Sequence, residues 1–69
     1  MLEVFKTNVE EADKAIELIW ILDQAFPGNR INFDLDDCDK VLRVEGLKFC
    51  TQTIITLVKS NGFACVLME

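Results

Sequence analysis

The sequence contains no histidine, and its seven lysine and arginine residues are scattered along 69 residues without a cluster. Without histidine, no Cys/His or Ser/His/Asp catalytic group can form, and no phosphate-binding loop is present. The net charge of −5 and the scattered basic residues argue against a nucleic-acid surface, which needs a basic patch. The many carboxylates lie in turn-like, exposed contexts that do not raise a pKa for acid catalysis. We therefore expect neither an enzyme nor a nucleic-acid-binding protein.

Long apolar runs are also absent. The nearest, Ala15 to Leu22, is interrupted by Glu17 and falls well short of the roughly 18 residues that cross a bilayer. The first residues lack a basic region followed by an apolar core, so we expect no signal peptide. The three cysteines, Cys38, Cys50 and Cys65, are an odd number at wide spacing, which does not suit a disulfide framework. These absences indicate a cytoplasmic protein with reduced thiols and no membrane contact.

The size and the composition indicate one domain over residues 1–69. Hydrophobic residues make up 51% of the chain, which places it far from the disordered class. Ordering costs on the order of 1.5 kcal/mol per residue, so a domain this small needs an efficient core or association with a partner.

The stretch from Arg30 to Gly46 predicts a β-hairpin. Apolar residues alternate with polar ones from Ile31 to Leu35, as expected for a strand with one buried face. The polar cluster 36–40 interrupts the pattern, and Val41 to Val44 resumes a β-prone run.

Two amphipathic helices are predicted on either side of this hairpin. We expect the first to start after Asn8 as N-cap, with Glu11 as the second half of a capping box, and to end at Pro27–Gly28. We expect the second over Thr51–Ser60, closed by Asn61–Gly62. The first helix has one predicted apolar face, which comprises Ala12, Ala15, Ile16, Ile19, Leu22 and Phe26.

Two further predicted strands, at the beginning and at the end of the chain, complete the pattern. Residues Leu2–Asn8 are β-prone, but either Glu3, Phe5 and Thr7 or Leu2, Val4 and Lys6 could face inward. Residues Phe63–Met68 alternate, with Phe63, Cys65 and Leu67 on one side. The order β-α-β-β-α-β predicts an α+β, ferredoxin-like fold: a four-stranded antiparallel sheet with two helices on one face.

The chain resembles the heavy-metal-associated domains of copper chaperones and metal-transporting ATPases. The resemblance rests on Phe26–Gly28 followed by Ile31–Leu35, on Val44–Gly46, and on Lys59–Phe63. That family binds metal through a Met-x-Cys-x-x-Cys loop between the first strand and the first helix. Here Val9 stands for the methionine, and Glu11 and Lys14 stand for the cysteines. The resemblance thus implies the fold without the metal-transfer activity, and we expect no cofactor.

Other residues offer a weaker metal site. The fold would bring Cys38, Asp36, Asp37, Asp39, Glu10 and Glu11 to one end of the sheet. The functional interpretation is a mixed thiolate–carboxylate cation site, and the alternative is a solvated acidic turn. Cys50 precedes a helix, which could lower its pKa or leave it structural, and Cys65 is expected to be a small buried hydrophobe.

Some apolar residues exceed what the core requires. Trp20 and Ile21 fall outside the predicted apolar face of the first helix, either as an interface or as the edge of the core. On the open sheet face we expect Val41, Ala64, Val66 and Met68. We therefore expect a non-enzymatic module that binds itself or another protein. The alternatives are low-affinity metal binding through Cys38, and a small-molecule-sensing domain of the ACT type, although Asn8–Glu10 lacks that type's glycine.

Overall fold

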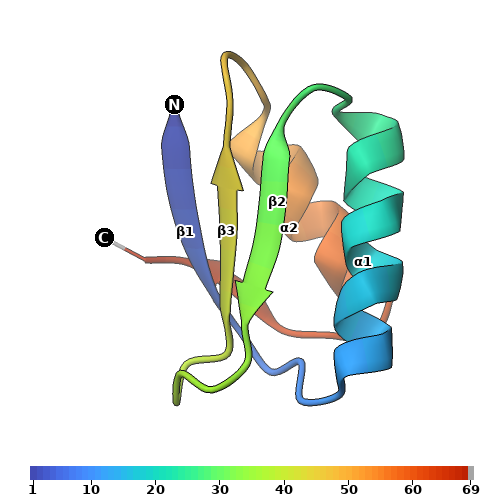
Figure 1. Cartoon of the computed structure of the whole chain (residues 1–69), viewed down its shortest axis with the longest axis vertical. Coiled ribbons are helices and arrows are strands. Elements are labelled where there is room, and N and C mark those ends of the chain that lie inside the picture. Colours follow the sequence, from blue (N-terminus) through green and yellow to red (C-terminus); the bar gives the residue numbers. More distant parts are fainter. Residues whose placement is uncertain (69) are drawn as a thin grey trace.

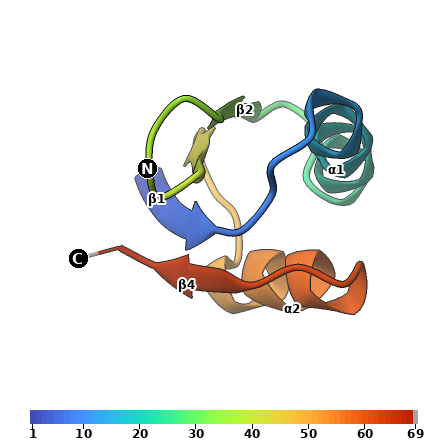
Figure 2. The ribbon, with the colours of Figure 1, turned by 90° about the horizontal axis from the view of Figure 1, so that it is seen from below.

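A computed structural model describes residues 1–68, and it confirms the predicted α+β, ferredoxin-like order. The elements are β1 (Leu2–Thr7), α1 (Ala12–Ala25), β2 (Arg30–Asp34), β3 (Val41–Glu45), α2 (Thr51–Ser60) and β4 (Cys65–Leu67). The four strands form one antiparallel sheet in the order β2-β3-β1-β4 (Figure 1). Both helices cover the same face of this sheet and leave the other face open (Figure 2). None of the helices within residues 1–68 has the length and apolar character to cross a bilayer.

The register of β1 resolves which of its residues face the core. Phe5 lies opposite Leu42 of β3 on one side and opposite Leu67 of β4 on the other. Phe5 is 0% exposed and Thr7 is 6% exposed, so the set that includes Phe5 and Thr7 points inward. Since side chains alternate along a strand, Leu2, Val4 and Lys6 lie on the open face.

The core forms between the sheet and both helices. Leu18 and Leu22 of α1 and Ile54 and Val58 of α2 are almost completely buried against the inward strand residues. Cys65, at 1% exposure, belongs to the same cluster, as its alternation with Phe63 and Leu67 predicted. The bounds of α2 agree with the predicted Thr51–Ser60, and Gly62 closes that helix with a φ of 92°.

The predicted start of α1 was wrong. The helix begins at Ala12 with Glu11 as N-cap, and no side chain caps it. Val9 is 0% exposed, and its backbone N–H donates to the Thr7 hydroxyl at 3.2 Å. Burial of Val9 thus holds residues 8–11 as an ordered loop. The Asn8 side chain does not cap α1 and instead accepts the backbone N–H of Ala64.

The predicted apolar face of α1 was partly wrong as well. Ile16 is 67% exposed, and Ala12 is exposed, whereas Leu18 is 2% exposed. Ala15 and Leu22 are buried as predicted. Because residues 18–22 are all apolar, the periodicity of this helix does not determine which side packs on the sheet.

Candidate functional site

Three loops meet at one end of the sheet, as expected from the topology. They are the β1–α1 loop (8–11), the β2–β3 loop (35–40) and the α2–β4 loop (61–64), at the lower end of Figure 1. The backbone N–H of Thr7 donates to the carbonyl oxygen of Asp39 at 3.0 Å. The backbone N–H of Ala64 donates to Asn8 Oδ1 at 2.8 Å. The first bond holds the candidate metal ligands of the β2–β3 loop against the end of β1, and the second joins the α2–β4 loop to the β1–α1 loop.

Within the β2–β3 loop, three side chains could share a cation. Asp37, Cys38 and Asp39 each offer a ligand atom, and these atoms lie within 4.8 Å of one another. Asp36 and Glu11, which the sequence also suggested, do not belong to this group. Among residues 1–68 it is the only such group of three. The cysteine and its flanking aspartates are therefore the part of the predicted site that the structure brings together.

Neighbouring groups already occupy part of this ligand set. The Lys6 ammonium lies 3.5 Å from Asp39 Oδ1. Asp37 Oδ1 accepts the backbone N–H of Asp39 at 2.8 Å, as in an Asx turn. The Lys40 ammonium donates to the carbonyl oxygen of Leu35 at 2.8 Å, so a second cation lies in the same loop. A metal ion would have to compete with the Lys6 ammonium for Asp39 and with the backbone N–H of Asp39 for Asp37.

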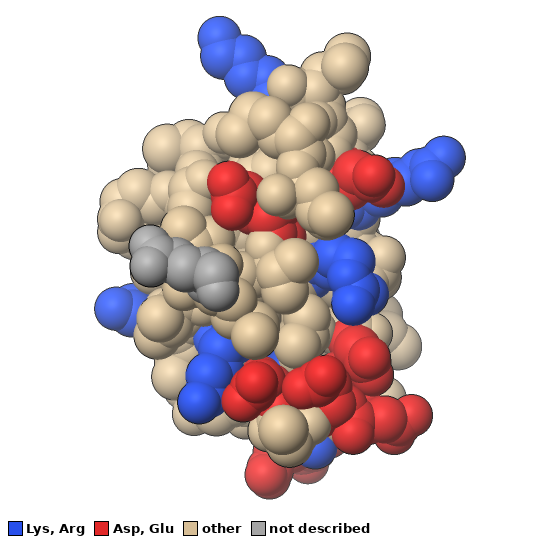
Figure 3. Space-filling view, turned by 90° about the vertical axis from the view of Figure 1, so that its left-hand side faces the viewer, with Lys and Arg blue, Asp and Glu red and all other residues tan. Residues whose placement is uncertain are grey.

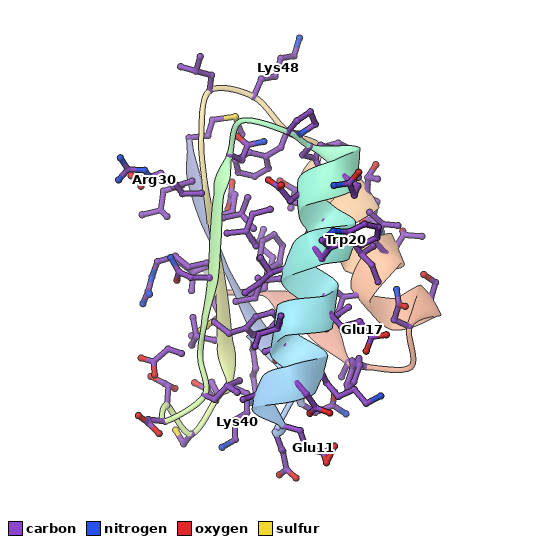
Figure 4. All side chains as sticks on the ribbon, turned by 45° about the vertical axis from the view of Figure 1, so that its right-hand side comes forward. Glu11, Glu17, Trp20, Arg30, Lys40 and Lys48 are labelled. Atoms are coloured by element: carbon purple, nitrogen blue, oxygen red, sulfur yellow. The ribbon has the colours of Figure 1, made fainter. Side chains whose placement is uncertain are left out.

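The β1–α1 loop offers no soft ligand. Val9 is buried in the core, and Glu11 is exposed at the start of α1, where it lies with Lys40 at the lower end of the molecule (Figure 4). The Lys14 ammonium lies 3.8 Å from Glu17 Oε2. The positions that the resemblance assigns to metal ligands thus hold an aliphatic group, a carboxylate and a paired ammonium.

A small hollow lies between α1 and the α2–β4 loop. Its volume is about 160 Å³, and its lining comprises Lys14, Glu17, Leu18, Ile21, Asn61 and Phe63. Pockets that enclose a small molecule usually measure about 300 to 1,000 Å³. Ile21 therefore faces a shallow recess, and the recess is too small to enclose an effector.

The two remaining thiols differ in environment. Cys50 is exposed at the N-cap of α2, where hydrogen bonds with the side chain and backbone of Thr53 lower its pKa. Burial raises the pKa of the Cys65 thiol to about 11, and Lys59 offsets this only in part. The β3–α2 loop, which ends at Cys50, and the β2–β3 loop, which contains Cys38, lie at opposite ends of the sheet (Figure 1), so the two thiols cannot act on one ligand.

Two apolar patches reach the surface. The first, here called the helix patch, comprises Ile16 and Trp20 of α1, which are 67% and 64% exposed. The second, here called the sheet patch, lies on the open face and comprises Leu2 and Val4 of β1, Val66 of β4 and Met68 directly after β4. Figure 3 looks onto this open face, whose middle is mostly uncharged and whose lower end is acidic.

The sequence located part of these patches. Trp20, Val66 and Met68 are exposed, as are Ala64, Leu2 and Ile16. Val41 is only 4% exposed, so the prediction that it adds to the accessible open face was wrong. The sequence alone could not assign Leu2 to the open face, because the register of β1 with β3 and β4 determines which of its side chains face the core.

Comparisons of the chain with protein-family models, with curated proteins and with solved structures find no match.

Proposed function

We propose that this domain is a non-enzymatic protein-interaction module that binds its partner through the sheet patch. The observation that carries the proposal is the exposure of Leu2 (55%), Val66 (60%) and Met68 (39%) on an uncovered sheet face, where the backbone N–H of Met68 donates to the carbonyl oxygen of Val4 between them at 2.9 Å. Scattered single apolar residues are normal on a protein surface, but a contiguous group usually marks an interaction site. The resemblance to heavy-metal-associated domains supports a scaffold that retains the fold while its loop ligands are replaced.

The test compares the wild type with the double variant Val66→Glu/Met68→Glu. The matched control is Gln52→Glu, which places a carboxylate at an exposed position of α2, away from the sheet patch. A partner is first captured by crosslinking in cell extract, identified, and purified. We expect the purified partner to bind the wild type and the control but not the double variant. Equal binding by all three proteins would show that the sheet patch is not the site.

A second candidate function is low-affinity cation binding at Asp37, Cys38 and Asp39. The clustering of their ligand atoms within 4.8 Å favours it. One thiolate with carboxylates is a mixed soft and hard donor set, for which zinc is a reasonable probe.

Zinc titration under reducing conditions tests this second candidate. Cys38→Ser should abolish binding, whereas Cys50→Ser, which removes the other exposed thiol, should leave it unchanged. Lys6→Gln should tighten binding because it removes the ammonium group beside Asp39. Zinc affinity that is the same in all these variants would exclude the site.

A further inference from the structure

β2 forms one edge of the sheet, and within residues 1–68 no strand lies beside its outer side (Figure 2). Such an edge presents unpaired backbone groups with which another strand can pair, and proteins commonly protect it with a proline, a bulge or an inward-pointing charge. β2 has none of these. Its five residues pair with β3 in an unbroken register, and its inward-pointing residues, Ile31 and Phe33, are apolar and only partly buried. β2 can therefore accept a further strand.

The hydrogen bonds of β3 show which backbone groups of β2 point outward. The N–H of Gly46 donates to the carbonyl oxygen of Met1 at 2.9 Å, so Gly46 bonds toward β1. Since the bonding direction alternates along an antiparallel strand, the residue before Gly46, and every second residue before that one, bonds to β2. Their partners are the first, third and fifth residues of β2. The N–H and C=O groups of the second and fourth residues, Ile31 and Phe33, therefore face the outer edge.

The side chains of β2 are complementary to those of a second β2. In antiparallel pairing centred on Asn32, Ile31 lies opposite Phe33 of the other copy, and Arg30 lies opposite Asp34. The outward backbone groups of Ile31 then meet those of Phe33, so all of them gain a partner. Pairing centred on any other residue leaves part of the strand unpaired or extends into the loops beside it.

The charges on and beside β2 are compatible with this pairing. Within residues 1–68, neither Arg30 nor Asp34 takes part in a salt bridge. In the β2–β3 register Arg30 lies opposite Glu45, whereas Asp34 lies opposite Val41, so a second copy provides a cation directly opposite Asp34. One oxygen of Asp34 accepts the backbone N–H of Asp36 at 3.2 Å, and the other oxygen can accept the guanidinium group. Like charges do not meet across the contact.

Helix α1 places apolar side chains beside the same edge. α1 contacts β2 and α2 contacts β4, so α1 is the helix nearer the free edge (Figure 2). Lys14, Glu17 and Ile21 line the hollow toward the α2–β4 loop, and the helical wheel places Ile16 and Ile19 on the opposite side of α1. Ile16 is 67% exposed. A second copy joined at β2 has its own α1 on the same side of the sheet, so these apolar side chains face each other across the two-fold axis.

We propose that two copies of this chain pair through β2 in a two-fold dimer, with one continuous sheet across both copies. The backbone edge alone would accept many strands. The order of β2, a cation, an apolar residue, an amide, an apolar residue and an anion, is its own complement when reversed, and this order selects a second copy. A two-fold contact uses the edge of both copies, so association stops at the dimer.

This dimer is separate from the proposed function. The sheet patch lies on β1 and at β4, and β3 separates β1 from β2. Both sheet patches therefore stay accessible in the dimer, on the same face of the joined sheet.

A charge-exchange experiment tests the pairing. Arg30→Asp and Asp34→Arg each oppose like charges at both ends of the contact, whereas their equimolar mixture and the double variant Arg30→Asp/Asp34→Arg restore opposite charges. Sedimentation velocity at low and high micromolar concentrations measures the association. We expect dimers of the wild type, of the mixture and of the double variant. The dissociation constant of each single variant should rise roughly tenfold or more.

The matched control is Val66→Glu/Met68→Glu, which changes the sheet patch but not β2 and should dimerise like the wild type. Single variants that dimerise as tightly as the wild type would overturn the pairing, and species larger than a dimer would contradict two-fold closure. A monomeric wild type would also overturn it and would leave the proposed function of the sheet patch untouched. Circular dichroism checks folding. If Arg30→Asp does not fold, Ile31→Pro replaces it, since that variant removes only an outward-facing N–H and should block pairing.

Amide hydrogen exchange measured by NMR gives a second test at single residues. In the monomer the N–H of Asn32 is bonded to β3, whereas those of Ile31 and Phe33 face outward. We expect exchange at Ile31 and Phe33 to slow at high protein concentration in the wild type but not in Arg30→Asp, with Asn32 as the internal reference. A dimer in which Ile31 and Phe33 still exchange fast would show that another surface forms the contact.

Discussion

The side chain of Asn8 accepts the backbone N–H of Ala64 at 2.8 Å, and this bond joins the β1–α1 loop to the α2–β4 loop. We expect Asn8→Ala to lower the free energy of unfolding by about 1 kcal/mol, because the Ala64 N–H loses its partner. Urea unfolding measures the change. Asn8→Asp is the matched control, since it keeps an acceptor oxygen in the same place, and it should lose less stability. Equal losses in the two variants would contradict the role of the Oδ1 atom.

Thr7 makes two hydrogen bonds through one hydroxyl group at the end of β1. The hydroxyl donates to the carbonyl oxygen of Lys40 and accepts the backbone N–H of Val9. Thr7 is 6% exposed, so replacement by valine leaves both backbone groups without a partner at a site that water hardly reaches. We expect Thr7→Val to cost about 1–3 kcal/mol in urea unfolding. Thr7→Ser keeps the hydroxyl and should cost less, so a greater loss in Thr7→Ser would refute this account.

Gly46 is required because Asn29 lies against its backbone. A Cβ atom at position 46 would lie 1.6 Å from Asn29 Oδ1. The Asn29 amide donates to the carbonyl oxygen of Phe26 at 3.0 Å, so moving it breaks a bond at the end of α1. We expect Gly46→Ala to lower the free energy of unfolding by about 1–3 kcal/mol.

A double-mutant cycle isolates this contact. In an Asn29→Ala background the oxygen that meets the new Cβ is gone, so Gly46→Ala should cost less there than in the wild type. Additive losses in the two backgrounds would show that Asn29 is not the cause.

The buried thiol of Cys65 predicts a pH dependence of stability. Burial raises the pKa of this thiol from 9.0 to about 11, so the folded state holds the proton more tightly than the unfolded state. Below pH 9 both states are protonated and the contribution is constant. Between about pH 9 and pH 11 the unfolded chain loses this proton first, so stability falls by at most about 1.4 kcal/mol per pH unit.

Urea unfolding across this pH range, compared between the wild type and Cys65→Ala, tests the prediction. The alanine variant should show a shallower decline, although its stability is lower below pH 9. Parallel curves for the two proteins would rule out the thiol as the source.

The sequence predicted the parts of the fold that depend on local signals. The bounds of α2 followed from the Asn61–Gly62 ending, and the hairpin followed from alternation interrupted by a polar turn. The acidic group around Cys38 was also predictable, because its three residues are consecutive in the chain.

The features that the sequence did not predict depend on contacts between residues far apart in the chain. Asn8 looks like an N-cap in sequence, but its partner Ala64 is 56 residues away. Ile16 fits an apolar face as well as Leu18 does, and only contact with the sheet selects Leu18 for burial. The sheet patch needs the register of β1 with β4, which no local pattern provides.

The central place of β1 in the sheet has a consequence for biosynthesis. The ribosome makes this strand before either of its neighbours, since β3 begins at Val41 and β4 at Cys65. Phe5 of a nascent chain therefore has strand neighbours on both sides, Leu42 and Leu67, only after almost the whole domain has emerged from the exit tunnel. Such late closure slows folding and favours engagement by chaperones during translation.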